Sequence, residues 1–134
     1  PTEAEWEYAY RARRTTALYN GGLKACKADN LANNIGWYHD NASGKTHPAK
    51  GKAANPWGLY DMAGNAWEWV NDWFAADLGN KKAVDPMGPA SGNGKVLKGG
   101  SYTVTAGGLR GAARQETPRD LSQSFLGFRV ARTL

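Results

Sequence analysis

The order of apolar and polar positions predicts a helix at the start of the chain. Residues 2–5 read Thr-Glu-Ala-Glu, which is a capping box: the first hydroxyl accepts from the last amide, and the last carboxylate accepts in return. Trp6 and Ala9 follow at helical spacing. We therefore expect a helix from about Glu3 to Arg13.

A period of two along the chain predicts short strands in its second half. Trp67, Trp69 and Asn71 alternate after a Gly-containing turn, which is the pattern of a half-buried strand. In the last predicted strand, Phe128 and Val130 fall on one apolar face. The C-terminal third as a whole predicts three strands, at Val96–Lys98, Leu109–Arg114 and Phe125–Val130.

Long irregular stretches separate these elements. Regular periodicity fails from Thr15 to Asn55 and again from Asp77 to Gly94, where Gly, Asn, Lys and Pro are frequent. Loops of this length are unusual inside a compact domain. We expect aromatic side chains such as Trp37 and Tyr38, or a metal ion, to hold the first stretch, and we expect the second to be a surface loop. The sum is a small α+β domain.

Length and composition fit one folded domain. The chain has 134 residues, of which 41% are hydrophobic and six are Trp, so a packed core is expected. The sequence contains no apolar run long enough to span a membrane and no signal-peptide pattern. It begins with Pro1 and not with Met, which predicts that it was cut from a longer chain. The net charge is +5, but the basic residues are scattered, so nucleic acid is not the predicted partner.

Side chains with reactive or metal-binding chemistry are few. Cys26 is the single cysteine, so neither an intrachain disulfide nor a Cys-based zinc site is available, and an unreactive thiol is favoured over a nucleophile. His39 and His47 lie in the irregular region, where turn hydrogen bonds or solvent contact are favoured over metal binding or acid–base roles.

Four segments spread over nearly the whole chain carry a resemblance to a known family. They are PTEAEWEYA (residues 1–9), NPWGLYDMAGNAWEWVNDW (55–73), VLKGGSY (96–102) and TPRDLSQSFLGFRVAR (117–132). In order and spacing they resemble the sulfatase-modifying-factor family, which is named for the formylglycine-generating enzyme. The resemblance implies a highly modified C-type-lectin fold with little regular secondary structure. It also implies that residues 1–134 are a single partial domain, the C-terminal half, which would require a complementary N-terminal half or a second chain.

The same resemblance implies bound calcium. One site would use the side chains of Asp61 and Glu68 together with the carbonyls of Gly64 and Ala66. The alternative, from the residues alone, is that Asp61 caps the turn and that Glu68 is a buried carboxylate paired with an Arg.

A second calcium site begins, by resemblance, at Asn34 and the carbonyl of Ile35. The family's later ligands for this site do not align with the chain. Asp40 and Asn41 are the candidate substitutes.

The copper chemistry of the family is not expected in this chain. Its active enzymes use two cysteines shortly after the Gly-Gly-Ser motif, because soft thiolates select Cu(I). Counting from Gly99, the matching positions are Val104 and Leu109, and neither side chain binds copper. We therefore expect no formylglycine-generating oxidase activity and no copper.

A ligand face is expected on the last strands, where family members present theirs. Arg110 and Arg114 are suited to bidentate recognition of carboxylate or phosphate. A structural pairing of Arg114 with Glu68 or Asp61 is the equal alternative, and Arg129 is expected to be structural. The predicted ligand-binding residues are Tyr102, Thr103, Thr105, Arg110, Arg114 and Arg119.

The sequence therefore predicts a non-catalytic, calcium-stabilised module that binds a protein or a small molecule. An alternative is an enzyme of the same family that works without the copper site, for which Glu116 and Asp120 are the acid–base candidates. A further alternative is a retroelement-diversified binding protein, which the mixed composition of Tyr102 to Phe125 disfavours. Relatives are often exported, so a location outside the cytoplasm is expected.

Overall fold

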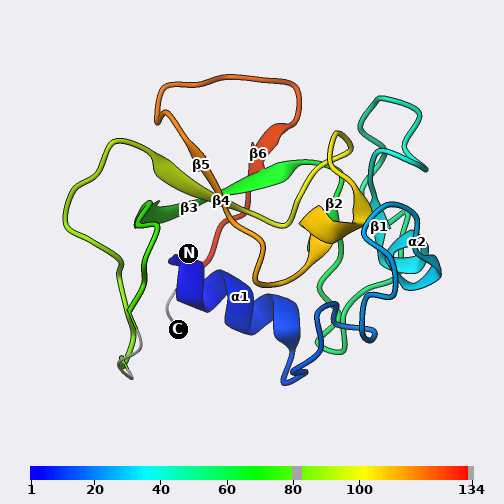
Figure 1. Ribbon diagram of the computed structural model, residues 1–134, viewed down its shortest axis with the longest axis horizontal. Coiled ribbons are helices and arrows are strands. Elements are labelled where there is room, and N and C mark those ends of the chain that lie inside the picture. Colours follow the sequence, from blue (N-terminus) through cyan, green and yellow to red (C-terminus); the bar gives the residue numbers. More distant parts are fainter. Residues whose placement is uncertain (80–82, 133–134) are drawn as a thin grey trace.

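The computed structural model describes residues 1–79 and 83–132, and it contains short elements linked by long ordered loops (Figure 1). The helices are α1 (Glu3–Arg11), α2 (Asn30–Ile35) and the 3₁₀ helix η1 (Ala106–Leu109). The strands are β1 (Gly36–Trp37), β2 (Ala63–Gly64), β3 (Trp67–Trp73), β4 (Lys95–Lys98), β5 (Gln115–Thr117) and β6 (Leu126–Phe128). The predicted α+β class with little regular structure is confirmed.

A four-stranded sheet has the order β5-β4-β3-β6. The β3–β4 and β4–β5 pairs are antiparallel, whereas β6 lies parallel to β3 at the edge of the sheet. The short strands β1 and β2 form a separate parallel pair. In Figure 1, α1 runs alongside the sheet, and β1, β2 and α2 gather at the other end of the molecule. Within the described residues, no helix is long and apolar enough to cross a membrane.

Helix α1 forms as its capping box predicts. The Thr2 hydroxyl accepts from the Glu5 amide at 3.2 Å, and the Glu5 carboxylate accepts from the Thr2 amide at 2.8 Å. The helix ends at Arg11, two residues before the predicted end, because Ala12 and Arg13 both have left-handed backbone angles. One face of the helix buries Trp6 and Tyr10 against the core.

Helix α2 lies in a stretch for which no element was predicted, so that prediction was wrong. Its six residues, Asn-Leu-Ala-Asn-Asn-Ile, are too few for a clear helical period and include three Asn, a weak helix former, although Ala32 and Ile35 are buried on one face. The helix depends on Asp29 at its N-cap. The Asp29 carboxylate accepts from the amides of Leu31 and Ala32 in the first turn, and also from those of Lys24 and Ala25.

Strand β3 is present, as the alternation predicted, but the alternating residues do not share one buried face. Trp67 is buried, Trp69 is only partly covered and Asn71 is exposed, whereas Glu68, Val70 and Asp72 are all buried. Two carboxylates therefore point inwards, where hydrogen bonds and cations compensate for their burial.

The C-terminal third agrees with the prediction only in part. Strand β4 confirms the strand at Val96–Lys98, and β6 lies within the predicted strand at 125–130. The predicted strand at Leu109–Arg114 is wrong: η1 ends at Leu109, whose side chain is fully buried, and β5 begins only at Gln115. The predicted apolar face of the last strand is solvent-exposed, with Phe128 at 77% and Val130 at 83%.

Buried asparagines and aromatic side chains hold the long loops. The Asn55 amide group donates to the carbonyls of Ala9 and Tyr10, and its oxygen accepts from two amides of its own turn. Asn65 bonds the backbone of His47 through both side-chain atoms, and its carbonyl accepts from Tyr102. The core itself is rich in aromatic residues and includes Trp6, Tyr10, Tyr19, Tyr38, Met62 and Leu109.

Candidate functional site

The segment after β4 carries the predicted ligand face and begins with a tight turn. Gly99 and Gly100 both have positive φ, at 91° and 77°. A Cβ at Gly100 would lie 2.9 Å from Leu109 Cδ2 and 3.2 Å from Val104 Cγ2. Val104 and Leu109, the two residues that the resemblance matches to the copper ligands, therefore converge on one point, and both present methyl groups there. Leu109 is fully buried, and Val104 packs against the core.

The hydroxyl-bearing residues of this face are tied to neighbouring side chains. The Tyr102 hydroxyl lies 2.8 Å from the Ser124 hydroxyl, and the Thr103 hydroxyl lies 2.8 Å from that of buried Ser101. Thr105 is exposed at the N-cap of η1. Arg119 is exposed in the loop after β5.

A hollow of about 520 Å³ opens beside η1 and β5. Its apolar walls include Trp67, Phe74 and Val104, and its basic groups are Arg110 and Arg114. The Arg110 Nε donates to the Gly107 carbonyl at 2.8 Å, and the side chain is exposed. Of the six residues predicted to bind ligand, the structure brings Arg110 and Arg114 together on this hollow; Tyr102, Thr103, Thr105 and Arg119 do not line it.

Arg114 forms an ion pair within the protein. Its Nε and Nη2 donate to the two Glu3 oxygens at 2.6 and 2.8 Å, and Nη1 donates to the Ala75 carbonyl. The structural role that the sequence analysis considered is therefore present, but the partner is Glu3 and not Glu68 or Asp61. The guanidinium also stacks over the Phe74 ring at 4.7 Å.

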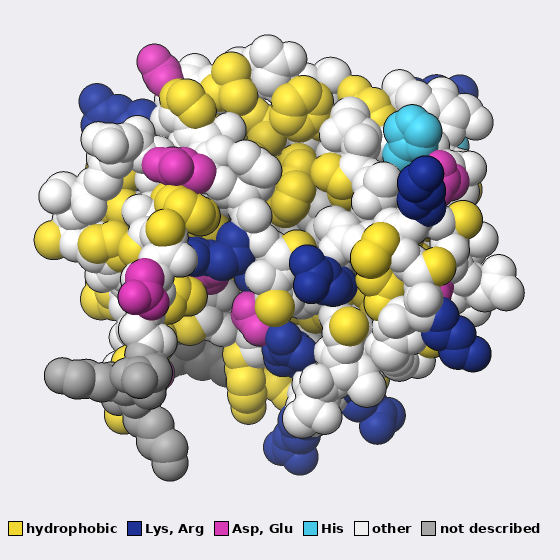
Figure 2. All heavy atoms as spheres, viewed as in Figure 1, with side chains coloured by type: hydrophobic (Ala, Val, Ile, Leu, Met, Phe, Trp, Pro, Cys, Tyr) yellow, Lys and Arg dark blue, Asp and Glu magenta, His cyan; other side chains and the backbone are white. Residues whose placement is uncertain are grey.

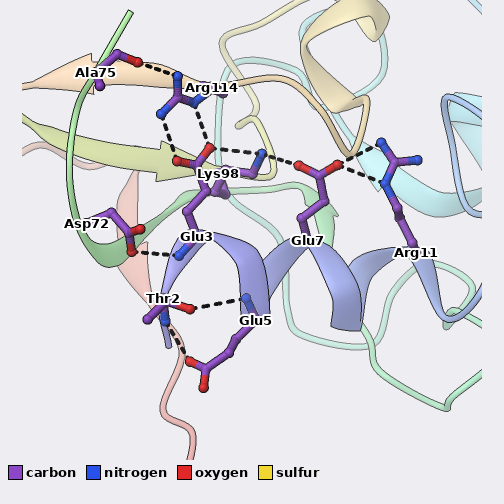
Figure 3. A network of polar contacts seen from close by, with 9 residues as sticks. All are labelled: Thr2, Glu3, Glu5, Glu7, Arg11, Asp72, Ala75, Lys98 and Arg114. Atoms are coloured by element: carbon purple, nitrogen blue, oxygen red, sulfur yellow. Dashed lines mark hydrogen bonds and ion pairs between the residues drawn. The ribbon is translucent and has the colours of Figure 1, made fainter. Parts of the chain in front are cut away.

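Figure 3 shows this pair as one end of a row of alternating charges along α1. Lys98 Nζ lies 3.6 Å from Glu3 and 3.0 Å from Glu7, and Arg11 pairs with Glu7 at 2.8 Å. The Lys98 side chain is 0% exposed, and its ion pairs with the two carboxylates compensate for the burial of the ammonium group. The row joins α1 to β4 and to the chain just before β5.

Glu68, a predicted calcium ligand, is a buried carboxylate bonded to donors of the chain itself. It accepts from Trp6 Nε1 at 2.6 Å and forms a two-point ion pair with Arg129 at 2.7 and 2.9 Å. Arg129 also donates to the Tyr60 carbonyl at 3.0 Å. The structural role expected for Arg129 is thus present, and Glu68 has the Arg partner that the alternative interpretation required.

The other predicted ligands of this calcium site lie on the turn before β3. The Asp61 carboxylate accepts from the Lys50 amide at 2.8 Å. Positive φ angles at Asp61, Gly64 and Asn65 bend the chain sharply between them. Both carboxylates thus accept hydrogen bonds from the protein, Glu68 through both oxygens and Asp61 through Oδ2. Calcium binding by Asp61, Gly64, Ala66 and Glu68 stays a prediction.

The residues of the second predicted calcium site lie at the end of α2. The Asn34 carbonyl accepts from the Ala53 amide, and the Ile35 carbonyl accepts from the Tyr19 hydroxyl at 3.3 Å. Of the candidate substitutes, Asp40 pairs with exposed His39 at 2.9 Å. The Asn41 side-chain oxygen accepts from the Tyr38 amide. This site also stays a prediction.

Two features near the ligand face were not evident from sequence. Cys26 is exposed, and although it lies far upstream its carbonyl accepts from Gly107, so the thiol sits beside η1. His39 is also close, because its amide donates to the Val104 carbonyl. No local pattern links these residues to η1. His47 stacks on Trp37 at 3.8 Å between ring centroids and bonds the Ala42 carbonyl, which is the turn role expected of it.

Comparison with known proteins connects the whole chain to one family. The profile of the sulfatase-modifying factor enzyme 1-like domain matches residues 1–134. The formylglycine-generating enzyme of Bos taurus is 39% identical over 144 residues, covering 98% of this chain and 38% of that protein. The serine/threonine-protein kinase pkn1 of Chlamydia caviae is 38% identical over 135 residues, covering 98% of this chain and 20% of the kinase.

A solved structure gives the same result for the fold. Treponema denticola variable protein 1 superimposes with a TM-score of 0.85 at 39% identity, covering 96% of this chain and 45% of that one. The chain thus spans less than half the length of each relative it matches here. The match along all four motifs, in sequence and in fold, leads to one conclusion: the chain belongs to the sulfatase-modifying factor enzyme 1-like family.

Proposed function

We propose that the chain is a non-catalytic binding module of this family, whose ligand face lies on the segments that follow β4. The observation that carries the proposal is the convergence of Val104 and Leu109 at Gly100. These are the positions at which the family resemblance puts the copper thiolates. Methyl groups supply no lone pair to a metal, and Cu(I) selects soft sulfur ligands.

The remaining thiol does not replace that pair. Cys26 is the only cysteine of the chain, and it lies beside Gly107 on the outer side of η1, where it is exposed. A single sulfur leaves the two-thiolate coordination of the family incomplete. The single cysteine therefore supports a ligand-binding role for the site over copper-dependent oxidation.

The composition of the hollow beside η1 also favours binding over catalysis. Its walls are Trp67, Phe74 and Val104, with the Arg110 guanidinium at the rim. The acid–base candidates of the enzyme alternative, Glu116 and Asp120, do not line it. An aromatic wall beside a guanidinium is suited to holding a ligand.

The kinase relative supports the idea of a module. In pkn1 of Chlamydia caviae the matching region makes up 20% of a longer protein named as a serine/threonine-protein kinase. A domain of this family therefore occurs within a protein whose name describes a different activity. That arrangement is typical of a binding domain attached to a separate catalytic domain.

The first test is an assay for formylglycine formation. The chain is incubated with a sulfatase-derived peptide containing the target cysteine, with copper and oxygen, and a formylglycine-generating enzyme serves as the positive control. We expect mass spectrometry to find no aldehyde. An aldehyde formed in proportion to the amount of chain added would overturn the proposal.

A gain-of-function variant tests the geometric argument separately. In Val104→Cys/Leu109→Cys, two thiols would replace two methyl-bearing groups that both reach Gly100. We expect the folded double variant to compete with a chromogenic chelator for Cu(I), whereas each single variant competes weakly. If the unchanged chain competes equally well for Cu(I), copper binds elsewhere on the chain, and the convergence of Val104 and Leu109 no longer supports the proposal.

A second candidate is the diversified binding protein considered from the sequence. The specific observation in its favour is the similarity to a protein named variable protein 1. It predicts gene copies that differ mainly at exposed positions of the ligand face, such as Thr103, Thr105 and Arg119. Sequencing of closely related isolates tests this: changes spread evenly over the chain would contradict it.

A further inference from the structure

Basic residues that are scattered along the sequence gather in the structure where the segments 11–28 and 106–113 meet. The two segments hold six of the seventeen Lys and Arg residues of the chain and no Asp or Glu. Both lie entirely within the described residues. Three backbone hydrogen bonds of 2.9 to 3.1 Å join them, from Ala106 to Lys27, from Gly107 to Cys26 and from Gly111 to Ala17.

Five of these six basic residues are exposed and form no ion pair with a described residue. The sixth, Arg11, pairs with Glu7 at 2.8 Å. Figure 2 shows Lys and Arg side chains over the end of α1 and the loop that follows it, in the lower right of the view. We call the five exposed residues the basic surface: Arg13, Arg14, Lys24, Lys27 and Arg110.

The basic surface corresponds to the whole net charge of the protein. The other twelve Lys and Arg residues equal the Asp and Glu residues in number, which leaves the excess of +5 to these five. Nearby carboxylates are already bonded to other groups: Glu7 to Arg11 and Lys98, Asp40 to His39, and buried Asp29 to four backbone amides. A partner would therefore supply the carboxylates that the five cations lack.

One residue connects the basic surface to an apolar hollow. Arg110 also lines the hollow of about 520 Å³ beside η1, whose walls include Trp67, Phe74 and Val104. The described residues that line this hollow include no Asp or Glu. An apolar side chain fits the hollow, while carboxylates on either side of that side chain would meet the cations.

Other polyanions fit the basic surface less well. Tyr19 is the one aromatic residue in the segments 11–28 and 106–113, and it is 3% exposed. These segments therefore offer no aromatic ring on which a nucleic-acid base could stack. They also lack an exposed Trp or Phe of the kind that anchors a basic surface in a membrane interface.

We propose that the basic surface and the adjoining hollow bind an acidic, apolar segment of a partner protein. Its carboxylates would pair with the guanidinium groups of Arg13, Arg14 and Arg110, which suit two-point contacts. Charge complementarity selects this occupant, because a basic segment would meet like charges. The inference rests on the proposed binding role and names the partner class, since Arg110 belongs to both surfaces.

The test uses a fluorescein-labelled peptide of about ten residues in which leucine and glutamate alternate. Fluorescence anisotropy should show saturable binding that weakens as salt rises, because the exposed charges are screened. The variant Arg13→Gln/Arg14→Gln should bind about fivefold more weakly. Its matched control, Lys45→Gln/Lys50→Gln, removes the same charge from exposed positions outside the basic surface and should bind nearly like the unchanged chain.

A second peptide tests the apolar contact. With serine in place of leucine, binding should weaken about tenfold, because no apolar side chain enters the hollow. Equal affinity for the serine peptide, or equal losses in the two double variants, would overturn the inference. Equally tight binding to vesicles of equal parts phosphatidylcholine and phosphatidylserine, or to single-stranded DNA of the same charge, would also overturn it and indicate a general polyanion site.

The formylglycine assay separates this inference from the proposed function. An aldehyde product would contradict the non-catalytic role whatever the affinity for the peptide. Absence of peptide binding, with no aldehyde formed, would overturn only the acidic partner and would leave the non-catalytic role intact.

Discussion

Glu68 shows how one buried side chain can join three parts of this molecule. Its carboxylate, 11% exposed, accepts from Trp6 on α1 and pairs with Arg129 after β6, and Arg129 reaches the Tyr60 carbonyl. A buried charge is costly unless it is paired and hydrogen-bonded, and here it is both. Loss of Arg129 would therefore leave the Glu68 carboxylate buried without a counter-charge.

The first prediction concerns this ion pair. Glu68→Gln should lower the free energy of unfolding by about 2 kcal/mol, because the partly buried Arg129 guanidinium loses its counter-charge. Arg129→Gln should cost a similar amount, and the double variant should cost clearly less than the two single losses combined. Urea titrations of all four proteins measure this coupling.

The exposed Glu116→Gln variant serves as the control and should stay within about 0.5 kcal/mol of the unchanged chain. Strictly additive losses would show that Glu68 and Arg129 do not interact in solution. In that case the ion pair would not explain the burial of Glu68.

At the scale of elements, two aspartates at helix N-termini have opposite electrostatic roles. Backbone amides, that of Lys24 foremost and then that of Ala32, lower the pKa of Asp29 at the start of α2. Burial raises the pKa of Asp72, whose carboxylate accepts from the Glu3 amide at the start of α1. The backbone amides around the start of α2 therefore favour the charged form of Asp29, whereas burial favours the neutral form of Asp72 against the opposing effect of the Glu3 amide.

The second prediction is the resulting pH dependence. A lowered pKa means that the contribution of Asp29 is present above its unfolded value of about 3.9 and is lost as pH falls through the folded pKa. Asp29→Asn should therefore reduce stability at neutral pH, because its NH₂ group would face the Lys24 and Ala25 amides. The variant should also lose less stability than the unchanged chain as the pH falls, because it has no carboxylate to protonate at this position.

Asp72 should behave in the opposite way. A raised pKa means that its contribution is present below the unfolded value and is lost as pH rises through the folded pKa. Asn can still accept from the Glu3 amide, so Asp72→Asn should preserve or raise stability at neutral pH. Urea midpoints measured between about pH 3 and 8 test both variants. A loss at neutral pH for Asp72→Asn would contradict the assignment.

The elements that could be predicted are those with a local signal. The capping box predicted α1, and the alternation after Gly64 predicted β3. Helix α2 also has a local signal, Asp29 at its N-cap, which the sequence interpretation missed because the helix is short. The burial of Glu68 and Asp72 could not be predicted, because it depends on donors far away in the sequence. The Trp6 indole bonds Glu68 across 62 residues, and the Glu3 amide bonds Asp72 across 69 residues.

The candidate site was predicted in part for the same reason. Val104 and Leu109, which position counting assigned to the family's cysteine positions, lie close together in the structure, because both side chains approach Gly100. The ion pair between Arg114 and Glu3 joins residues 111 positions apart, and no spacing pattern in the sequence predicts it. Likewise, the proximity of Cys26 to Gly107 arises only when the long loop folds back.

At the scale of the whole molecule, polar side chains hold the long loops in place through hydrogen bonds to the backbone, a role that longer strands have in other folds. Asn55 ties the loop at 55–59 to α1, and Asn65 ties the β2 turn to the loop at 47 and to the segment after β4. Such loops supply many carbonyl oxygens, which is the ligand type that calcium prefers. Calcium bound to such oxygens would therefore stabilise the folded state.

The last prediction decides between a calcium ion and Arg129 as the cation that stabilises Glu68. If the sites predicted from the resemblance bind calcium, about 10 mM calcium should stabilise the chain by about 1–3 kcal/mol relative to chelator, for sites in the millimolar class. The melting temperature should rise accordingly, and Glu68→Ala should abolish most of the rise. Magnesium at the same concentration is the control, since its smaller ion demands stricter octahedral geometry. If calcium and chelator give the same melting temperature, the Arg129 guanidinium is sufficient for Glu68 and both calcium sites are excluded.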